Sequence, residues 1–167
     1  MFDRSDPAYH EAARFMAITY LVDAASQSGE ASAATAILAE LERLAQLTPS
    51  PTLRAGLVYA RPILAEDDAA EGLFDAALRG DLRRHPFDHA RLQLAYGAWL
   101  RRQRRVLESR APLRAAREVF DALGCVPWGD RARHELRASG EQSRQRIPAA
   151  RDQLTPQELQ IAQMAAT

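Results

Sequence analysis

The sequence predicts an all-α protein made of antiparallel helix hairpins. Alanine and leucine are abundant, whereas aromatic residues make up only 7% of the chain, and this balance favours helix over sheet. Apolar residues recur every three or four positions in most segments, as on one face of a helix. Proline and glycine separate these segments, and no segment alternates as a half-buried strand does.

Size and composition limit the class of protein. A chain of 167 residues is long enough for one domain with a real core. All 22 basic residues are Arg, which excludes a P-loop lysine and a Schiff-base lysine. The arginine content fits a GC-rich gene or pairing with anions. A lone Cys125 and an N-terminus without an apolar run favour a cytoplasmic protein.

The first half of the chain predicts four helices. Pro7 precedes a helix that ends at Gly29, and Ser32 caps a second helix that ends before the segment TPSP. Pro51 begins a third helix, which Pro62 should kink or divide. Asp67 and Asp68 then cap a fourth helix, ending at Gly80.

The second half predicts three more helices. A long helix is expected over 87–109, a sixth from Pro112 to Gly124, and a seventh from Trp128 to about Gly140. Small residues within the apolar faces should let neighbouring helices approach closely; these are Ala90, Gly97 and Ala116.

The predicted hairpins form a repeat. They begin near residues 7, 51, 87 and 127, and a period of about 40 residues lies in the range of helical repeats. We therefore expect a tetratricopeptide-like α-α superhelix over 1–140, in which each hairpin needs its neighbours to bury its apolar surface. Residues 141–153 are polar and predict a linker.

The last segment, LTPQELQIAQMAAT, predicts a helix start at 154–167. Thr155 is a suitable N-cap, Pro156 suits the first helical position, and Glu158 completes a capping box. An apolar side follows these residues.

Charge is distributed unevenly along the chain. Residues 1–78 hold 12 acids and 5 Arg, whereas residues 79–167 hold 10 acids and 17 Arg. This asymmetry fits a surface for nucleic acid, head-to-tail self-association, or an unremarkable drift of solvated helix faces. The densest basic run, 100–110, fits a solvated helix better than phosphate contacts, because Arg104 can pair with Glu108 at i, i+4.

No constellation of residues predicts catalysis. His85 and His89 are four residues apart, but Pro86 lies between them and no further ligand completes a zinc set. A phosphate loop and a nucleophile elbow are both absent from the sequence. We expect no cofactor, no metal and no catalytic residue in this chain.

The aromatic residues have two interpretations. Trp99 and Trp128 suit core packing, with Trp128 locking one hairpin against the next. If the chain is instead a free-standing adaptor holding a peptide in a concave groove, Tyr59, Tyr96 and Trp99 are the expected partner contacts.

The C-terminal residues resemble a known family. LTPQELQIAQMAAT is similar to the opening of the DNA-binding domain of LuxR-type transcription regulators, whose first helix begins Leu-Thr-x-x-Glu. The preceding region resembles the helical-repeat region of the large ATP-binding members of that family. The similarity there rests on Phe87, Ala90-Arg91, Tyr96-Gly97, Leu100-Arg101-Arg102, Phe120-Asp121-Ala122-Leu123-Gly124 and Pro127-Trp128.

This resemblance implies a larger parent protein. The parent would have an N-terminal nucleotide-binding module, where ATP could bind, then helical repeats and a C-terminal helix-turn-helix that contacts DNA. Only the first helix-turn-helix helix falls in this chain, so DNA binding is expected from the missing helices. The residues implied to build that helix are Leu154, Thr155, Glu158, Leu159, Ile161 and Met164. This chain would act as a sensing, coupling or self-association module.

Overall fold

Seven α-helices and one 3-10 helix make up the part of the chain that the structure describes. The computed structural model describes residues 10–141, without the side chains of residues 11, 12 and 81. The elements are α1 (Glu11–Ser28), α2 (Ala31–Leu47), α3 (Pro51–Leu64), α4 (Asp67–Arg79), η1 (Asp81–Arg84), α5 (Pro86–Arg102), α6 (Val106–Ala122) and α7 (Val126–Ala138). Residues 10–141 contain no strand, which confirms the all-α prediction.

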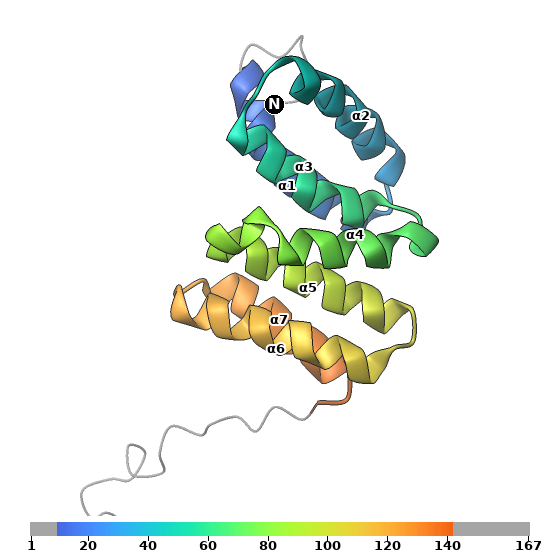
Figure 1. Ribbon diagram of the computed structural model, residues 1–167. Coiled ribbons are helices and arrows are strands. Elements are labelled where there is room, and N and C mark those ends of the chain that lie inside the picture. Colours follow the sequence, from blue (N-terminus) through green and yellow to red (C-terminus); the bar gives the residue numbers. More distant parts are fainter. Residues whose placement is uncertain (1–9, 142–167) are drawn as a thin grey trace, which may run out of the picture.

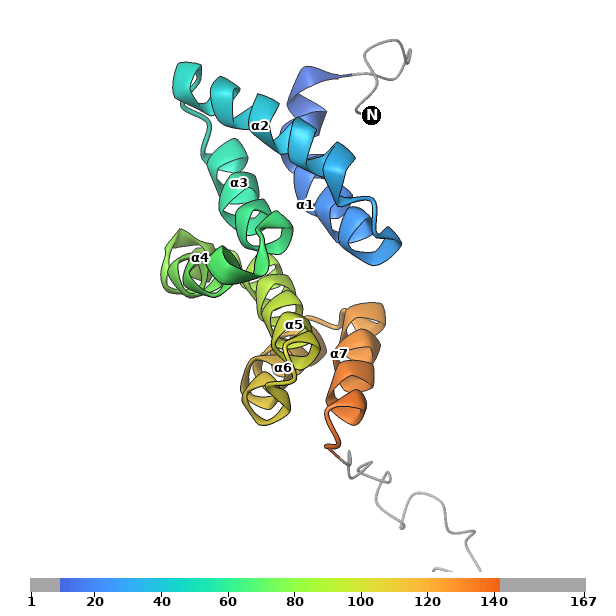
Figure 2. The same cartoon turned by 90° about the vertical axis from the view of Figure 1, so that its right-hand side faces the viewer.

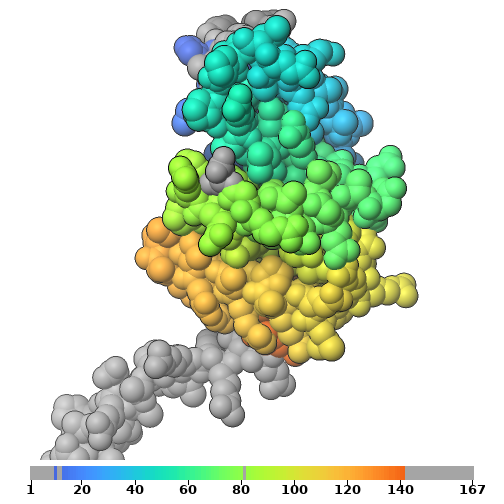
Figure 3. All heavy atoms as spheres, in the orientation of Figure 1, coloured from blue at the N-terminus to red at the C-terminus, as the bar shows by residue number. Residues whose placement is uncertain are grey.

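Consecutive helices pack against each other and turn back on themselves. Each helix contacts its successor in the chain, as antiparallel hairpins do, and α1 also packs on α3. The hairpins follow one another from α1 and α2 to α6 and α7 (Figure 1). From the side, α1 and α7 lie on one side of α3 and α5, whereas α4 and α6 lie on the other (Figure 2). In the space-filling view of the same face, the atoms of each hairpin touch those of the next one along the chain (Figure 3).

Several helix ends follow the predicted signals. Gly29, with φ of +77°, ends α1 in the left-handed conformation that glycine adopts most easily. The Ser50 hydroxyl accepts a hydrogen bond from the Leu53 backbone N–H at 3.2 Å. Pro51 and Pro86 are the first residues of α3 and α5, where the missing N–H costs nothing.

The predicted long helix over 87–109 is wrong. The chain turns at residues 103–105, so α5 ends at Arg102 and α6 begins at Val106. Arg104 has φ of +62°, and the Arg105 N–H donates to the Leu100 carbonyl at 2.9 Å. Gly124 and Gly140, which also have positive φ, follow α6 and α7 in the same way. The Cys125 N–H donates to the Phe120 carbonyl, and the Glu141 N–H donates to the Leu136 carbonyl. Because an arginine replaces the usual glycine at the first of these turns, the sequence gives no stop signal there.

Other boundaries differ by smaller amounts. Pro112 lies inside α6 rather than at its start, and Glu108 pairs with Arg105 at 2.6 Å rather than with Arg104. Glu30, not Ser32, precedes α2. Pro62 lies in the last turn of α3 and does not divide it. Glu66 occupies the N-cap position of α4, with Asp67 and Asp68 in the first turn.

Within residues 10–141, the core consists of three apolar clusters along the row of hairpins. The first joins α1, α2 and α3 around Ile18 and Leu41, the second joins α3, α4 and α5 around Phe74, and the third joins α5, α6 and α7 around Phe120. Close packing confirms the role predicted for Gly97. A Cβ atom on this residue would lie 2.5 Å from Leu113 Cγ, so α5 and α6 can approach this closely only because the side chain is missing.

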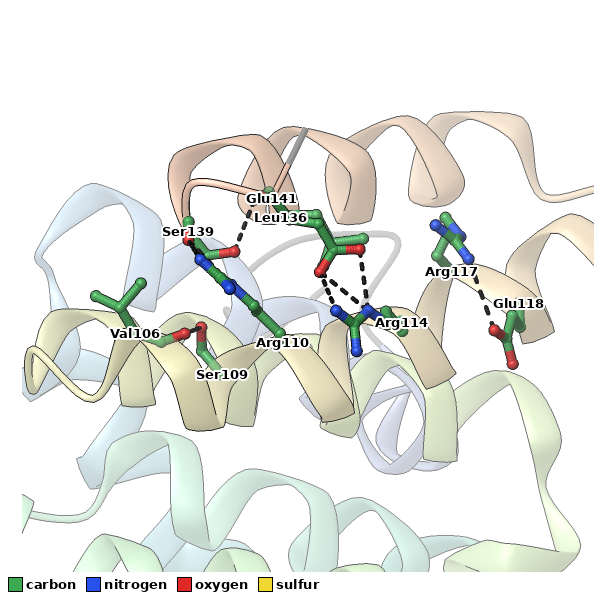
Figure 4. A network of polar contacts seen from close by, with 9 residues as sticks. All are labelled: Val106, Ser109, Arg110, Arg114, Arg117, Glu118, Leu136, Ser139 and Glu141. Atoms are coloured by element: carbon green, nitrogen blue, oxygen red, sulfur yellow. Dashed lines mark hydrogen bonds and ion pairs between the residues drawn. The ribbon is translucent and has the colours of Figure 1, made fainter. Parts of the chain in front are cut away.

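Polar contacts hold the end of α7 against α6. The Arg110 guanidinium donates to the Ser139 carbonyl oxygen at 2.7 Å, and Arg114 pairs with Glu141 at 2.7 Å. Both arginines extend from α6 toward the last turn of α7 (Figure 4). They supply cations where the helix dipole places partial negative charge.

Candidate partner-binding site

A buried arginine lies where four helices meet. Arg91 belongs to α5 and only 1% of its surface is exposed. Its guanidinium donates to Asp23 Oδ2 at 2.7 Å and to Thr19 Oγ1 at 3.0 Å, both on α1, and to Asp88 Oδ1 at 3.3 Å. On α3, the Tyr59 hydroxyl donates to the other carboxylate oxygen of Asp23 at 2.6 Å. We call these five residues the Arg91 hub.

Aromatic rings surround the same guanidinium. The ring centroids of Tyr20, Tyr59 and Trp128 lie 4.4, 4.9 and 4.9 Å from Arg91 Cζ, and that of Phe87 lies at 5.6 Å. Cations over aromatic faces are attracted by the ring quadrupole. Because Trp128 belongs to α7, the Arg91 hub and these rings connect the first helix with the last.

The hub shifts the proton equilibrium of Tyr59. Burial, followed by the charge of Asp23, raises the pKa of the Tyr59 hydroxyl well above its usual value, because both disfavour a phenolate. Tyr59 therefore stays neutral and continues to donate its proton to Asp23. The pKa of Arg91 is also raised: burial opposes its charge, but the attraction of Tyr59 once that hydroxyl has ionised, and of Asp23 at any pH where its carboxylate is charged, outweighs this effect.

Neighbouring hollows border this part of the molecule. The α3–η1 hollow, ≈ 350 Å³, is lined by Pro49, Pro51, Arg54, Ala55, Val58, Leu82, Arg84 and His85. The α1–α5 hollow, ≈ 310 Å³, shares Pro51, Ala55 and His85 with it and adds residues of α1 and the start of α5. The α1–α7 hollow shares Tyr20 with the second and is otherwise lined by Asp23, Ala24, Gln27, Ser28, Trp128 and Arg131.

The α1–α7 hollow combines apolar surface with an available cation. Tyr20 lines this hollow and is 58% exposed; Met16, one turn earlier on α1, is 69% exposed and lines the adjoining α1–α5 hollow. The Arg131 guanidinium lies 5.5 Å from the centroid of the Trp128 ring. Among the described residues, Arg131 has no ion-pair partner. The hollow can therefore accept an apolar side chain beside an anionic group.

The aromatic residues predicted to contact a partner lie deeper in the protein. Tyr59 and Trp99 are buried, and Tyr96 is half-buried and stacked on Trp99 with ring centroids 6.0 Å apart. The Trp99 Nε1–H donates to Asp67 Oδ1 at 2.9 Å. All three belong to the apolar cluster around Phe74, in which the rings of Tyr96 and Trp99 stack and the Tyr59 hydroxyl bonds to Asp23 of the Arg91 hub. The contact of these three residues with a partner stays a prediction. The helix predicted at 154–167 also stays a prediction, because its residues lie outside those that the structure describes.

Sequence reasoning missed Asp23 and Arg91. The available signal was a charge within a mainly apolar stretch: Asp23 follows Val22 in α1, and Arg91 stands between Ala90 and Leu92. Such residues are rarely buried unless they are paired. The pairing itself could not be predicted, because it joins residues 68 positions apart.

Trp128 packs as its position predicts. Its ring centroid lies 5.8 Å from that of Phe87 and 5.7 Å from that of Phe120. The indole therefore joins α7 to both helices of the preceding hairpin.

The two histidines considered as metal ligands have separate surroundings. The His89 Nε2 atom lies 3.2 Å from the Leu78 carbonyl oxygen, whereas His85 lines the α3–η1 and α1–α5 hollows. Within the described residues, no group of His, Cys, Asp and Glu side chains could hold a metal ion. None of the helices at 10–141 is both long and apolar enough to cross a membrane.

Comparisons with protein-family models, with curated proteins and with solved structures found no match for this chain. Its function is therefore inferred from the residues and from the geometry of the site.

Proposed function

We propose that this chain is a helical-repeat module of a LuxR-type transcription regulator, working in the cytoplasm and without enzymatic activity of its own. It couples a signal to the DNA-binding part of the parent protein by binding a protein segment or a second copy of the chain. ATP, if the parent uses it, would bind to a separate module.

The arrangement of the hairpins supports a tetratricopeptide-like superhelix. Helices α3, α5 and α7 begin at residues 51, 86 and 126, which gives intervals of 35 and 40 residues and agrees with helical repeats. Together with α1, these helices carry the Arg91 hub and its aromatic rings. Extended concave surfaces in such proteins bind their partners.

One observation carries the partner-binding proposal: the α1–α7 hollow presents the exposed Tyr20 beside Trp128 and Arg131, and the exposed Met16, one turn earlier on α1, lines the adjoining α1–α5 hollow. A partner segment would bury the two apolar side chains of α1 and place a carboxylate at Arg131. Burying each of them would contribute up to about 1.5–3 kcal/mol, before the cost of ordering the partner.

Site-specific cross-linking tests this surface. A photoreactive phenylalanine analogue replaces Met16 in one protein and Leu107 in another, since Leu107 is similarly exposed, at 74%, but lies on α6. We expect Met16 to give one discrete adduct in cells, weakened by Tyr20→Ser, and Leu107 to give none. Equal adducts from both positions, or an adduct insensitive to Tyr20→Ser, would contradict the proposal.

A free-standing adaptor is the second candidate, because the same hollow would serve a peptide-binding protein without any DNA-binding domain. The two candidates predict different codons after residue 167 in the gene. A glycine followed by a segment similar to Ser-Asn-x-Glu-Ile-Ala supports the regulator, whereas a stop codon supports the adaptor.

A further inference from the structure

The α3–η1 hollow gathers three basic side chains: Arg54, Arg84 and His85. In the part of the chain that the structure describes, none of these side chains has an ion-pair or hydrogen-bond partner. Several arginines elsewhere are paired. Arg101, Arg105, Arg114 and Arg133 each pair with a carboxylate at 2.6–2.8 Å. The hollow therefore holds positive charge that its own lining does not neutralise.

Among the side chains that the structure describes, no acidic one lines this hollow. Asp88, in the adjacent α1–α5 hollow, is already bound to Arg91 at 3.3 Å. The first residue of α3, Pro51, belongs to the wall, so the positive end of a helix dipole adds to the field of the side chains. The local electrostatics favour an anion.

The remaining lining is apolar. Pro49, Ala55, Val58 and Leu82 belong to it, together with Pro51. A volume of ≈ 350 Å³ lies at the lower end of the range for small-molecule sites. At about 30 Å³ for each water-sized group, it has room for roughly ten non-hydrogen atoms. A ligand here would combine a charged head with a short apolar body.

We propose that the α3–η1 hollow binds a small organic anion, a carboxylate or a phosphate monoester with a short apolar tail. Arg54 and Arg84 hold the charged oxygens, since guanidinium groups match both anions in geometry. The tail lies against Val58 and Leu82. The site is separate from the α1–α7 hollow, so the inference does not depend on how the partner segment binds.

Isothermal titration calorimetry with hexyl phosphate and hexanoate tests the site on the full chain. We expect saturable binding of one molecule of each anion. Inorganic phosphate should bind at least about tenfold more weakly because it leaves the apolar wall uncovered, and 1-hexanol should not bind because it lacks the charge. Failure of both anions to bind at millimolar concentration, or equal binding of inorganic phosphate and hexyl phosphate, overturns the proposal.

Matched variants locate the binding. Arg54→Gln and Arg84→Gln should each weaken hexyl phosphate binding at least about tenfold, because a charge-assisted hydrogen bond is lost. The affinity of Arg84→Lys should lie between those of the unaltered protein and Arg84→Gln, since lysine keeps the charge but cannot donate two parallel hydrogen bonds as a guanidinium does. Arg137→Gln, at an exposed residue of α7 outside the hollow, should bind as the unaltered protein does. Circular dichroism checks that each variant is folded, and equal losses in all variants overturn the assignment.

Vesicles separate a free anion from a lipid headgroup. The protein should not sediment with phosphatidylserine vesicles. Sedimentation that requires Arg54 and Arg84, combined with no binding of hexyl phosphate, would replace the small-molecule site with a lipid-binding one.

Discussion

The substitution Asp23→Ala should destabilise the protein far more than the removal of any exposed carboxylate. Asp23 accepts hydrogen bonds from Arg91 at 2.7 Å and from Tyr59 at 2.6 Å. Its side chain is 12% exposed, and that of Arg91 only 1%. The variant would therefore leave a buried guanidinium without its closest counter-charge and a buried hydroxyl without its acceptor.

The magnitude can be worked out from these contacts. Removing one partner of a buried ion pair costs about 3–5 kcal/mol. Asp88 still lies 3.3 Å from Arg91, and water can reach part of the vacated volume, so we expect a loss near the lower limit, about 3 kcal/mol. A further substitution, Arg91→Met, removes the orphaned charge and should restore at least about 1 kcal/mol.

Urea unfolding followed by far-ultraviolet circular dichroism measures both effects. Glu42→Ala is the matched control, because Glu42 pairs with Arg61 at the same 2.7 Å but both side chains are more than a third exposed. Its effect should stay within about 1 kcal/mol. If Asp23→Ala costs no more than the control, or if Arg91→Met fails to restore stability, the reasoning about the Arg91 hub is refuted.

Three further predictions concern packing, pH and charge. Gly97→Ala should lower the free energy of unfolding by about 1–3 kcal/mol, whereas Gly72→Ala, whose Cβ meets nothing within 4 Å, should raise it by up to about 1 kcal/mol; equal effects in urea unfolding contradict the packing argument. Because the folded state raises the pKa of Tyr59, the hydroxyl stabilises the fold below the unfolded pKa, and this contribution is lost as pH rises above about 10, by up to about 1.4 kcal/mol per pH unit. Tyr59→Phe should flatten that decline, and parallel pH curves of unfolding free energy would count against it. If the oppositely charged halves attract each other between copies, the mass from sedimentation should fall as salt rises, and a monomer at every salt concentration excludes this association.

The helices were predictable because their causes are local. Periodic apolar residues and start signals such as Pro51 and Pro86 act within a few residues, so the number of α-helices could be derived from the sequence, whereas the 3-10 helix η1 was not predicted. The turn at Arg104 could not, because its backbone conformation is stabilised by the packing of α5 against α6 rather than by the residue itself. Tertiary contacts there outweigh the roughly 1–2 kcal/mol that a non-glycine residue costs in the left-handed region.

The candidate site was less predictable than the fold. Aromatic residues drew the sequence interpretation to Tyr59 and Trp99, yet a large ring predicts burial as well as it predicts contact with a partner. The residues that surround the hollows, such as Arg54, Arg84 and Met16, looked like ordinary surface positions in the sequence. Their importance depends on which helices meet, and that information is non-local.

The Arg91 hub has a consequence for how the molecule unfolds. In a row of hairpins that contact only their neighbours, the ends can unravel while the middle persists. Arg91 joins residues of α1 to α5, and the ring of Trp128 on α7 lies over the same guanidinium. Loss of either terminal helix therefore removes groups that hold the Arg91 guanidinium in place, so the two ends are energetically coupled through this residue. Amide hydrogens in α1 and α7 should then exchange with the same opening free energy, as parts of one cooperative unit.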